Sequence, residues 1–190
     1  MNEGVVVLAI LLGIPLAILV VLTLIYNSLV QGRNHCDEAW ANIDTELKRR
    51  YDLIPNLVRT VQGYAQHERE LLESVSQARA SAMANNGSPA SQARDENQLI
   101  HGLRQLLAVA ESYPALKANE NFLSLQTELA NTEDRIQRSR RFYNANVRDY
   151  QNRLQVFPSN LIASAFSFPP REFFEIDDAS QREVPAVQSL

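Results

Sequence analysis

Three histidines and one cysteine are the residues of this 190-residue chain best suited to metal binding or nucleophilic chemistry. His67 and Glu68 resemble the start of the zinc motif H-E-x-x-H, but position 71 is leucine where that motif has its second histidine. Residues 35–38 read His-Cys-Asp-Glu, and adjacent residues fan around a helix instead of converging on one ion. We therefore expect no metal site and no cofactor.

Motifs of the common enzyme classes are also missing from the sequence. It contains no C-x-x-C pair, no phosphate-binding glycine loop and no G-x-S-x-G elbow. Its single cysteine, Cys36, excludes an intrachain disulfide. Acidic pairs such as Glu128 and Glu133 have no nucleophile or base beside them, so we expect them to be salt-bridge partners. The sequence predicts a protein that is not an enzyme; an enzyme with an unrecognised site is the less favoured alternative.

The amino-terminal 26 residues predict a membrane anchor. From Gly4 to Tyr26 the chain has 23 positions without a charged side chain. As a helix this run is about 34 Å long, enough to cross the hydrocarbon core of a bilayer. A cleaved signal peptide would have a basic start and a small-residue cleavage site, whereas this chain begins MNEG and no A-x-A follows the run. We expect a retained, single-pass transmembrane helix over residues 1–26.

Charge around this span predicts its orientation. Arg33, Lys48, Arg49 and Arg50 all follow the span, and no basic side chain precedes it. By the positive-inside rule the amino terminus is outside and the rest of the chain lies in the cytoplasm.

Small residues recur every four positions within the span, at Ala9, Gly13 and Ala17. Such spacing lets two helices approach closely in lipid. We interpret these residues as a transmembrane packing face and expect a homo-oligomer.

The remaining chain carries apolar residues at helical spacing, with steps of three and four. The first stripe continues across Pro55 and includes Trp40, Ile43, Leu47, Ile54, Leu57, Val61, Leu72 and Val75. The sequence NNGSP at 85–89 is the first clear stop, with Ser88 as a cap and Pro89 as the first residue of the next helix. That helix is predicted to end at SYP, residues 112–114, and ALKANEN after it is predicted to be a loop.

A last long helix, starting near a cap at Asn119 or Asn121, is predicted to reach the residue before Pro158. Its apolar stripe has one polar interruption, at Ser139 or Arg140. The predicted fold is all-α: an antiparallel bundle of long helices following a single N-terminal transmembrane helix. We assign residues 1–26 to the anchor, 27–170 to the bundle and 171–190 to an acidic C-terminal tail.

Pro55 is the anomaly in the first stripe. Proline has no N–H to give to the carbonyl of Tyr51, and its ring pushes that carbonyl away, at a cost of about 3 kcal/mol when nothing compensates. The sequence therefore predicts a bend here, and a polar group from elsewhere that satisfies the freed carbonyl.

Charged residues on two helices are candidates for that compensation. We expect a cross-helix polar network in which Arg49 or Arg50 pairs with Glu128 or Glu133. An arginine of the last long helix, such as Arg135, is expected to reach the carbonyl near Tyr51. The alternative is that these charges form ordinary solvated faces, which contribute little to stability.

The sequence resembles the LemA family over nearly its whole length. The similar stretches are "ANIDTELKRRYDLIPNLVRTVQGYAQHE" (41–68), "LQTELANTEDRIQRSRRFYNANVRDYQNRLQVFPSNLIA" (125–163), and "FPPREFFEI" followed by "REVPAV". The resemblance implies a protein of the bacterial inner (cytoplasmic) membrane with its amino end outside, a cytoplasmic helical bundle and no established molecular activity.

These observations together favour a membrane-anchored scaffold or adaptor that self-associates and presents helix surfaces to other proteins, whose identity they do not reveal. A membrane-shaping or lipid-contacting oligomer is the alternative, since the last long helix is rich in arginine. The expected partners are the lipid bilayer, further copies of the chain and other membrane or cytoplasmic proteins. The net charge of −4 is mild and acids interrupt the arginine run, so we expect no nucleic acid partner.

Overall fold

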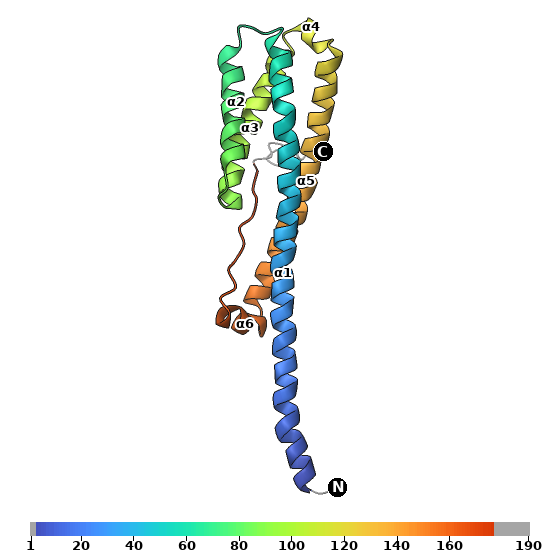
Figure 1. Ribbon diagram of the computed structural model, residues 1–190, viewed down its shortest axis with the longest axis vertical. Helices are drawn as coiled ribbons and strands as arrows, with labels where there is room; N and C mark the ends of the chain where they lie inside the picture. Colours follow the sequence, from blue (N-terminus) through green and yellow to red (C-terminus); the bar gives the residue numbers. More distant parts are fainter. Residues whose placement is uncertain (1–2, 177–190) are drawn as a thin grey trace, which may run out of the picture. The chain divides into compact units, whose positions relative to one another are not determined.

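The structure is a computed structural model that describes residues 3–176, and all regular structure in that range is helical (Figure 1). The helices are α1 (Glu3–Gln62), α2 (Arg69–Ala84), α3 (Pro89–Ala110), α4 (Pro114–Lys117), α5 (Glu120–Gln155) and α6 (Ser159–Ala165). No strand occurs among the described residues, so the predicted all-α fold is confirmed.

The helices belong to two compact units. The first unit comprises Met1–Asn42 and Arg141–Arg171, and the second comprises Ile43–Arg140 and Glu172–Leu190. Residues 177–190 of the predicted acidic tail lie outside the described residues, and the domain limits at residues 26 and 170 stay predictions.

Antiparallel packing of α1 against the end of α5 organises the first unit. The ring centres of Trp40 and Tyr143 lie 5.3 Å apart. About two turns before Trp40 in α1, Gly32 faces Tyr150 of α5. A Cβ at Gly32 would lie only 3.1 Å from Cδ2 of Tyr150, so glycine permits this close approach. The two helices therefore meet without room for a larger residue at position 32.

Hydrogen bonds also fix the chain after α6 within the first unit. The Tyr150 hydroxyl donates to the carbonyl of Pro169 at 3.0 Å, and Gln151 donates to the carbonyl of Arg171 at 2.7 Å. Arg171 in turn pairs with Asp37 at 2.5 Å. Cys36 is buried beside this pair, and burial raises the pKa of its thiol although Arg171 opposes the rise.

The amino-terminal part of α1 has no packing partner among the described residues. Within residues 3–176 it is the one helix long and apolar enough to cross a membrane. Its most apolar 18-residue window has a mean hydropathy of 2.4, and none of that window is buried. The predicted N-terminal span is therefore a single, exposed apolar helix.

In the second unit α2 and α3 form an antiparallel hairpin (Figure 1). As predicted, Ser88 caps α3 by accepting from the N–H of Ser91 at 3.3 Å, and Pro89 is the first residue of that helix. Gly102 of α3 faces Val75 of α2, and a Cβ at position 102 would lie 3.1 Å from Cγ2 of Val75. The hairpin packs closely because this position has no side chain.

Two connections in the second unit differ from the sequence prediction. Helix α1 ends at Gln62 and α2 begins at Arg69, so the first stop is at residues 63–68 and not at 85–89. Ala65 is fully buried there, which anchors the turn. The segment predicted as a loop after α3 contains the short helix α4, while Asn119 caps α5 by accepting from the N–H of Phe122 at 3.0 Å.

The polar interruption in the α5 stripe is a buried arginine. Arg140 is only 7 % exposed and donates to the carbonyl of Ile176 at 2.6 Å. Phe174 is fully buried nearby in the same unit, and Glu172 accepts from the N–H of Ala90 at 3.4 Å. Arg140 can be buried within the apolar stripe because the Ile176 carbonyl accepts its hydrogen bond.

Candidate functional site

A buried charge cluster lies at the centre of the second unit. Arg50 of α1 is fully buried and pairs with two acids, Glu96 of α3 and Glu133 of α5. Its Nη1 donates to both carboxylate oxygens of Glu133, at 2.8 and 3.1 Å, and its Nη2 donates to Glu96. One guanidinium thus links three helices.

Glu96 is the buried carboxylate of this cluster, and neutral groups complete its hydrogen bonding. Its Oε1 accepts from the hydroxyl of Tyr51 and, at 2.8 Å, from the amide of Gln92. The same amide also donates to the Ala82 carbonyl at 3.0 Å and lies 3.1 Å from the Tyr51 hydroxyl. We call Arg50, Tyr51, Gln92, Glu96 and Glu133 the buried charge cluster.

Electrostatic interactions within the cluster raise the pKa values of Arg50 and Tyr51. Burial disfavours a charged guanidinium, but the carboxylates of Glu133 and Glu96 outweigh burial and raise the pKa of Arg50 above its ordinary value. Burial and the negative charge of Glu96 raise the pKa of the Tyr51 hydroxyl well above its ordinary value. Arg50 therefore stays charged and Tyr51 stays a neutral donor at physiological pH.

The carbonyl freed by Pro55 has a partner, but not the predicted one. Helix α1 runs through Pro55 without ending. The Tyr51 carbonyl accepts from Nε of Arg79 at 2.6 Å, so the prediction of an arginine from the last long helix is wrong. Arg79 lies on α2, which folds back beside α1 after the turn at 63–68. The sequence prediction contains no turn at 63–68 and so does not bring α2 beside α1.

The other residues predicted for the network lie outside the cluster. Arg49 is exposed and lies 3.7 Å from Glu46, one turn away on the same helix. Glu128 is exposed, and its backbone carbonyl accepts from Thr132. Arg135 is half-buried on α5. Of the predicted pairs, the structure brings together Arg50 and Glu133.

Sequence reasoning missed Glu96, Gln92, Tyr51 and Arg79. A signal for two of them was present, because the leucine stripe of α3 (Leu99, Leu103, Leu106) extends backwards by steps of three and four to residues 96 and 92. Polar residues in register with a buried stripe predict a buried polar network.

The predicted transmembrane packing residues lie on α1. Gly13 has nothing within 4 Å of the position where a Cβ would stand, and Ala17 is exposed. Ala9 is helical, and its side chain is outside what the structure describes. A packing role between copies of the chain stays a prediction.

The polar groups of the buried charge cluster are largely shielded from solvent. Arg50, Tyr51, Gln92 and Glu96 are each less than a tenth exposed, and their polar groups are directed at one another. Only Glu133 reaches solvent, with 34 % of its side chain exposed. Among residues 3–176, no three histidine, cysteine or acidic residues lie close enough together to hold a metal ion.

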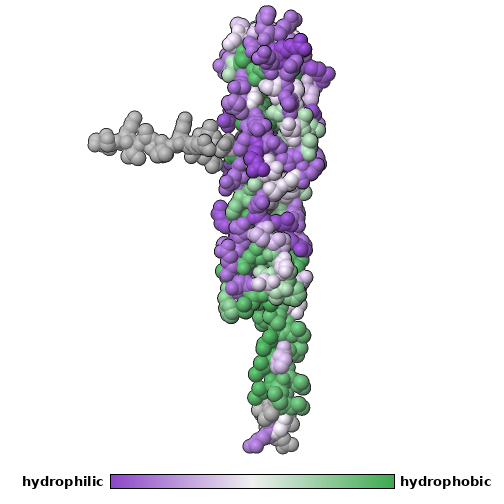
Figure 2. Space-filling model, turned by 90° about the vertical axis from the view of Figure 1, so that its left-hand side faces the viewer, coloured by the Kyte–Doolittle hydropathy of each residue, from purple (hydrophilic) through white to green (hydrophobic). Residues whose placement is uncertain are grey.

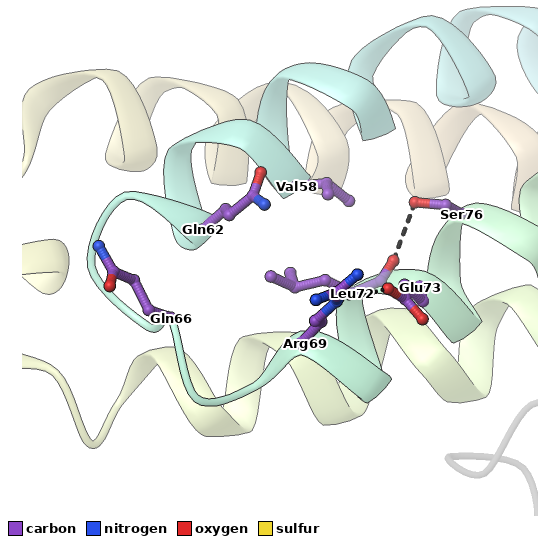
Figure 3. A pocket seen from close by; sticks show the side chains of 7 residues that line it. All are labelled: Val58, Gln62, Gln66, Arg69, Leu72, Glu73 and Ser76. Atoms are coloured by element: carbon purple, nitrogen blue, oxygen red, sulfur yellow. Dashed lines mark hydrogen bonds and ion pairs between the residues drawn. The ribbon is translucent and has the colours of Figure 1, made fainter.

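An open groove of about 460 Å³ lies between the end of α1 and the start of α2 (Figure 3). Val58 and Leu72 provide apolar surface, and Arg69 and Glu73 form an ion pair at its rim, 2.8 Å apart. Gln62, Gln66 and Ser76 complete the lining. The groove therefore combines apolar and polar side chains from two helices.

Comparison with known proteins identifies relatives that align with most of this chain. Magnetosome protein MamQ 2 of Paramagnetospirillum magneticum is 24% identical over an alignment covering 90% of this chain and 72% of the relative. Protein LemA of Metamycoplasma hominis is 25% identical over 83% of this chain and 72% of the relative. Magnetosome protein MamQ of Magnetospirillum gryphiswaldense is 23% identical over 90% of this chain and 72% of the relative. The sequence model of the LemA family matches residues 39–188, a range that contains the whole buried charge cluster, and the chain therefore belongs to the LemA family.

Proposed function

We propose that this protein is a helical scaffold or adaptor, anchored by α1 in the bacterial inner membrane, that self-associates and presents helix surfaces to partner proteins. The observation that carries the proposal is the bonding of Glu96. The carboxylate oxygens of this fully buried acid accept hydrogen bonds from Arg50, Tyr51 and Gln92. Its chemistry is used to hold α1 and α3 in one register, as a rigid display surface requires.

Anchoring is supported by the exposed apolar part of α1. Arg33 follows that part in the sequence, and Arg153 of α5 donates to the Ser28 carbonyl at 3.0 Å, so two cations gather where the span ends. This charge favours an amino terminus outside and helices in the cytoplasm. Protease added to spheroplasts should leave a carboxyl-terminal tag intact, and protease added to inverted vesicles should remove it; the reverse pattern would refute the orientation.

Self-association can be tested with two differently tagged copies expressed together. We expect the copies to co-purify in mild detergent, and the double substitution Gly13→Leu/Ala17→Leu to weaken that co-purification. The matched control is Ile14→Leu/Ile18→Leu, which keeps the spacing but changes a neighbouring face of the same exposed helix. A monomer by light scattering in several detergents would refute self-association.

Partner proteins can be tested at the groove between α1 and α2. A photo-crosslinking residue at Gln62, on the groove, is compared with one at Gln105, an exposed site on α3. We expect adducts in native membranes from position 62 and not from position 105. The adducts should disappear when Val58, in the groove, is replaced by aspartate. Equal adducts from both positions, unaffected by that change, would argue against a presented surface.

A further inference from the structure

We propose that residues 156–168, here called the α6 segment, form a second membrane contact that lies in the interfacial layer of the bilayer spanned by α1. This inference rests on the proposed anchoring of α1. It concerns a surface of the first unit, whereas the groove lined by Val58 and Leu72 belongs to the second unit.

The α6 segment exposes large apolar side chains on both sides of its short helix. Phe157 is 78 % exposed and Phe166 is 62 % exposed, while Leu161 and Val156 are more than half exposed. Isolated apolar residues on a surface need no explanation, but four within eleven residues indicate an interaction surface. The outer face of the segment is therefore apolar, and its exposure to water is unfavourable.

The inner face of the segment packs where the span leaves the membrane. Ile162 and Ala163 are buried against Leu29, which lies three residues beyond Tyr26, the end of the predicted span. Ile25, Leu154 and Phe168 extend the same cluster. Because these contacts hold α6 beside the end of the span, the outer face must lie at the depth of the membrane surface whenever α1 crosses the bilayer.

Aromatic rings join the span to the segment. The ring of Tyr26 makes edge-on contacts with Phe166, at 5.0 Å, and with Phe168, at 5.6 Å. Figure 2 shows apolar surface continuing from the amino-terminal part of α1 onto the region of α6. Clusters of aromatic rings at this depth are typical of membrane–water interfaces.

Cations follow directly after the rings. The guanidinium of Arg33 lies 5.9 Å from the centre of the Phe168 ring, and Arg153 bonds to Ser28 through its carbonyl and its hydroxyl, at 3.0 and 3.1 Å. An apolar helix, then aromatic rings, then arginines is the order in which hydrocarbon, interface and phosphate groups follow one another in a bilayer. Lipid is therefore the occupant that fits both the apolar face and the charges beside it.

The test uses the full chain reconstituted in vesicles of phosphatidylcholine and phosphatidylglycerol. Trp40 is the only tryptophan of the sequence, so Trp40→Phe gives a silent background. In that background Phe157→Trp places one fluorophore on the outer face of the α6 segment. We expect lipids brominated at a shallow position of the acyl chain to quench its emission, and lipids brominated at a deep position to quench it less.

The matched control is Phe142→Trp in the same background. Phe142 is 59 % exposed on α5 and belongs to the same unit, but it precedes the end of α5 by 13 residues, about 20 Å of helix. Both sites are exposed aromatic positions, so both replacements should leave the fold unchanged. We expect no quenching of Phe142→Trp by either brominated lipid.

Leu16→Trp, within the exposed apolar part of α1, separates failure of the anchor from failure of the inference. Emission from position 16 that the deep bromines leave unquenched would refute the anchoring itself. Quenching at position 16 without quenching at position 157 would overturn the inference while the anchor stands. Blue-shifted but unquenched emission from position 157 would likewise overturn it, because a protein surface, such as a second copy, would then cover the segment.

Discussion

The guanidinium of Arg50 and the carboxylate of Glu96, 46 residues apart in the chain, form an ion pair in which neither side chain is exposed to solvent. Removing one member is costly where the other stays buried without a counter-charge, as Glu96 would without Arg50. Arg50 without Glu96 would still bond Glu133. We therefore expect the pair to contribute more to specifying one arrangement of α1 and α3 than to net stability. This property suits a scaffold whose surfaces must be held in register.

Single and double substitutions of the pair should differ sharply. We expect Arg50→Leu alone to lower the free energy of unfolding by about 3–5 kcal/mol, since it leaves Glu96 buried without a cation. Glu96→Leu alone should cost less, since Arg50 keeps its bonds to Glu133. The double variant should cost clearly less than the sum, because it removes both members of the ion pair and leaves neither charge buried without the other. Urea unfolding in detergent, followed by circular dichroism, measures all three.

Glu133→Gln serves as the comparison for that cycle. Glu133 also bonds Arg50, but a third of its side chain reaches solvent, so we expect a loss of about 1 kcal/mol. Strictly additive costs for Arg50→Leu and Glu96→Leu would contradict the cluster as an interacting unit.

Removing the partner of the Tyr51 carbonyl should matter only while residue 55 is proline. Arg79→Met should lower the free energy of unfolding by about 1.5–3 kcal/mol, as expected for a lost hydrogen bond from a charged donor. In a Pro55→Ala background the same change should cost much less, because the alanine N–H can donate to that carbonyl. Denaturant unfolding of the four chains gives the interaction energy.

Arg69→Met on the same helix is the matched control for Arg79. Its guanidinium is exposed and pairs only with Glu73 one turn away, so we expect no measurable change in either background. An equal cost of Arg79→Met with proline or alanine at position 55 would show that Arg79 acts through some other contact.

Close packing of α2 on α3 predicts a volume effect at Gly102. Gly102→Val should lower the free energy of unfolding by about 1–3 kcal/mol through overpacking, since even a Cβ would crowd Val75. Val75→Ala makes room, so the double variant should recover part of that loss. Thermal unfolding by circular dichroism tests this, and a double variant worse than the sum of the singles would contradict the geometry.

The raised pKa of Tyr51 predicts that the free energy of unfolding falls at alkaline pH. Its pKa is raised in the folded chain, whereas an unfolded tyrosine ionises near pH 10. The unfolded state therefore loses its proton first, so this contribution is fully present below about pH 10 and declines as the pH rises further. Urea midpoints measured between about pH 8 and 11 should fall less steeply for Tyr51→Phe than for the parent chain; parallel curves would contradict a neutral, buried hydroxyl.

The helices of this protein were largely predictable because their signals are local. The uncharged run to Tyr26, the apolar steps of three and four, and the Ser88–Pro89 start of α3 depend only on neighbouring residues. The turn at 63–68 and the short helix α4 were missed because their sequences carry weak stop and start signals; the burial of Ala65 and Leu116 favours them only once the helices pack.

The sequence by itself determined the apolar N-terminal helix, the all-helical class and a carbonyl before Pro55 that needs a donor from outside its own helix. Tertiary structure alone decided which polar groups meet. Arg79 reaches the Tyr51 carbonyl from 28 residues away, and Glu96 reaches Arg50 from 46 residues away, because chain reversals bring α2 and α3 beside α1. The sequence offers many possible partners for each charged side chain. Burial makes an unpaired charge costly, so the packing of the helices determines which pair forms.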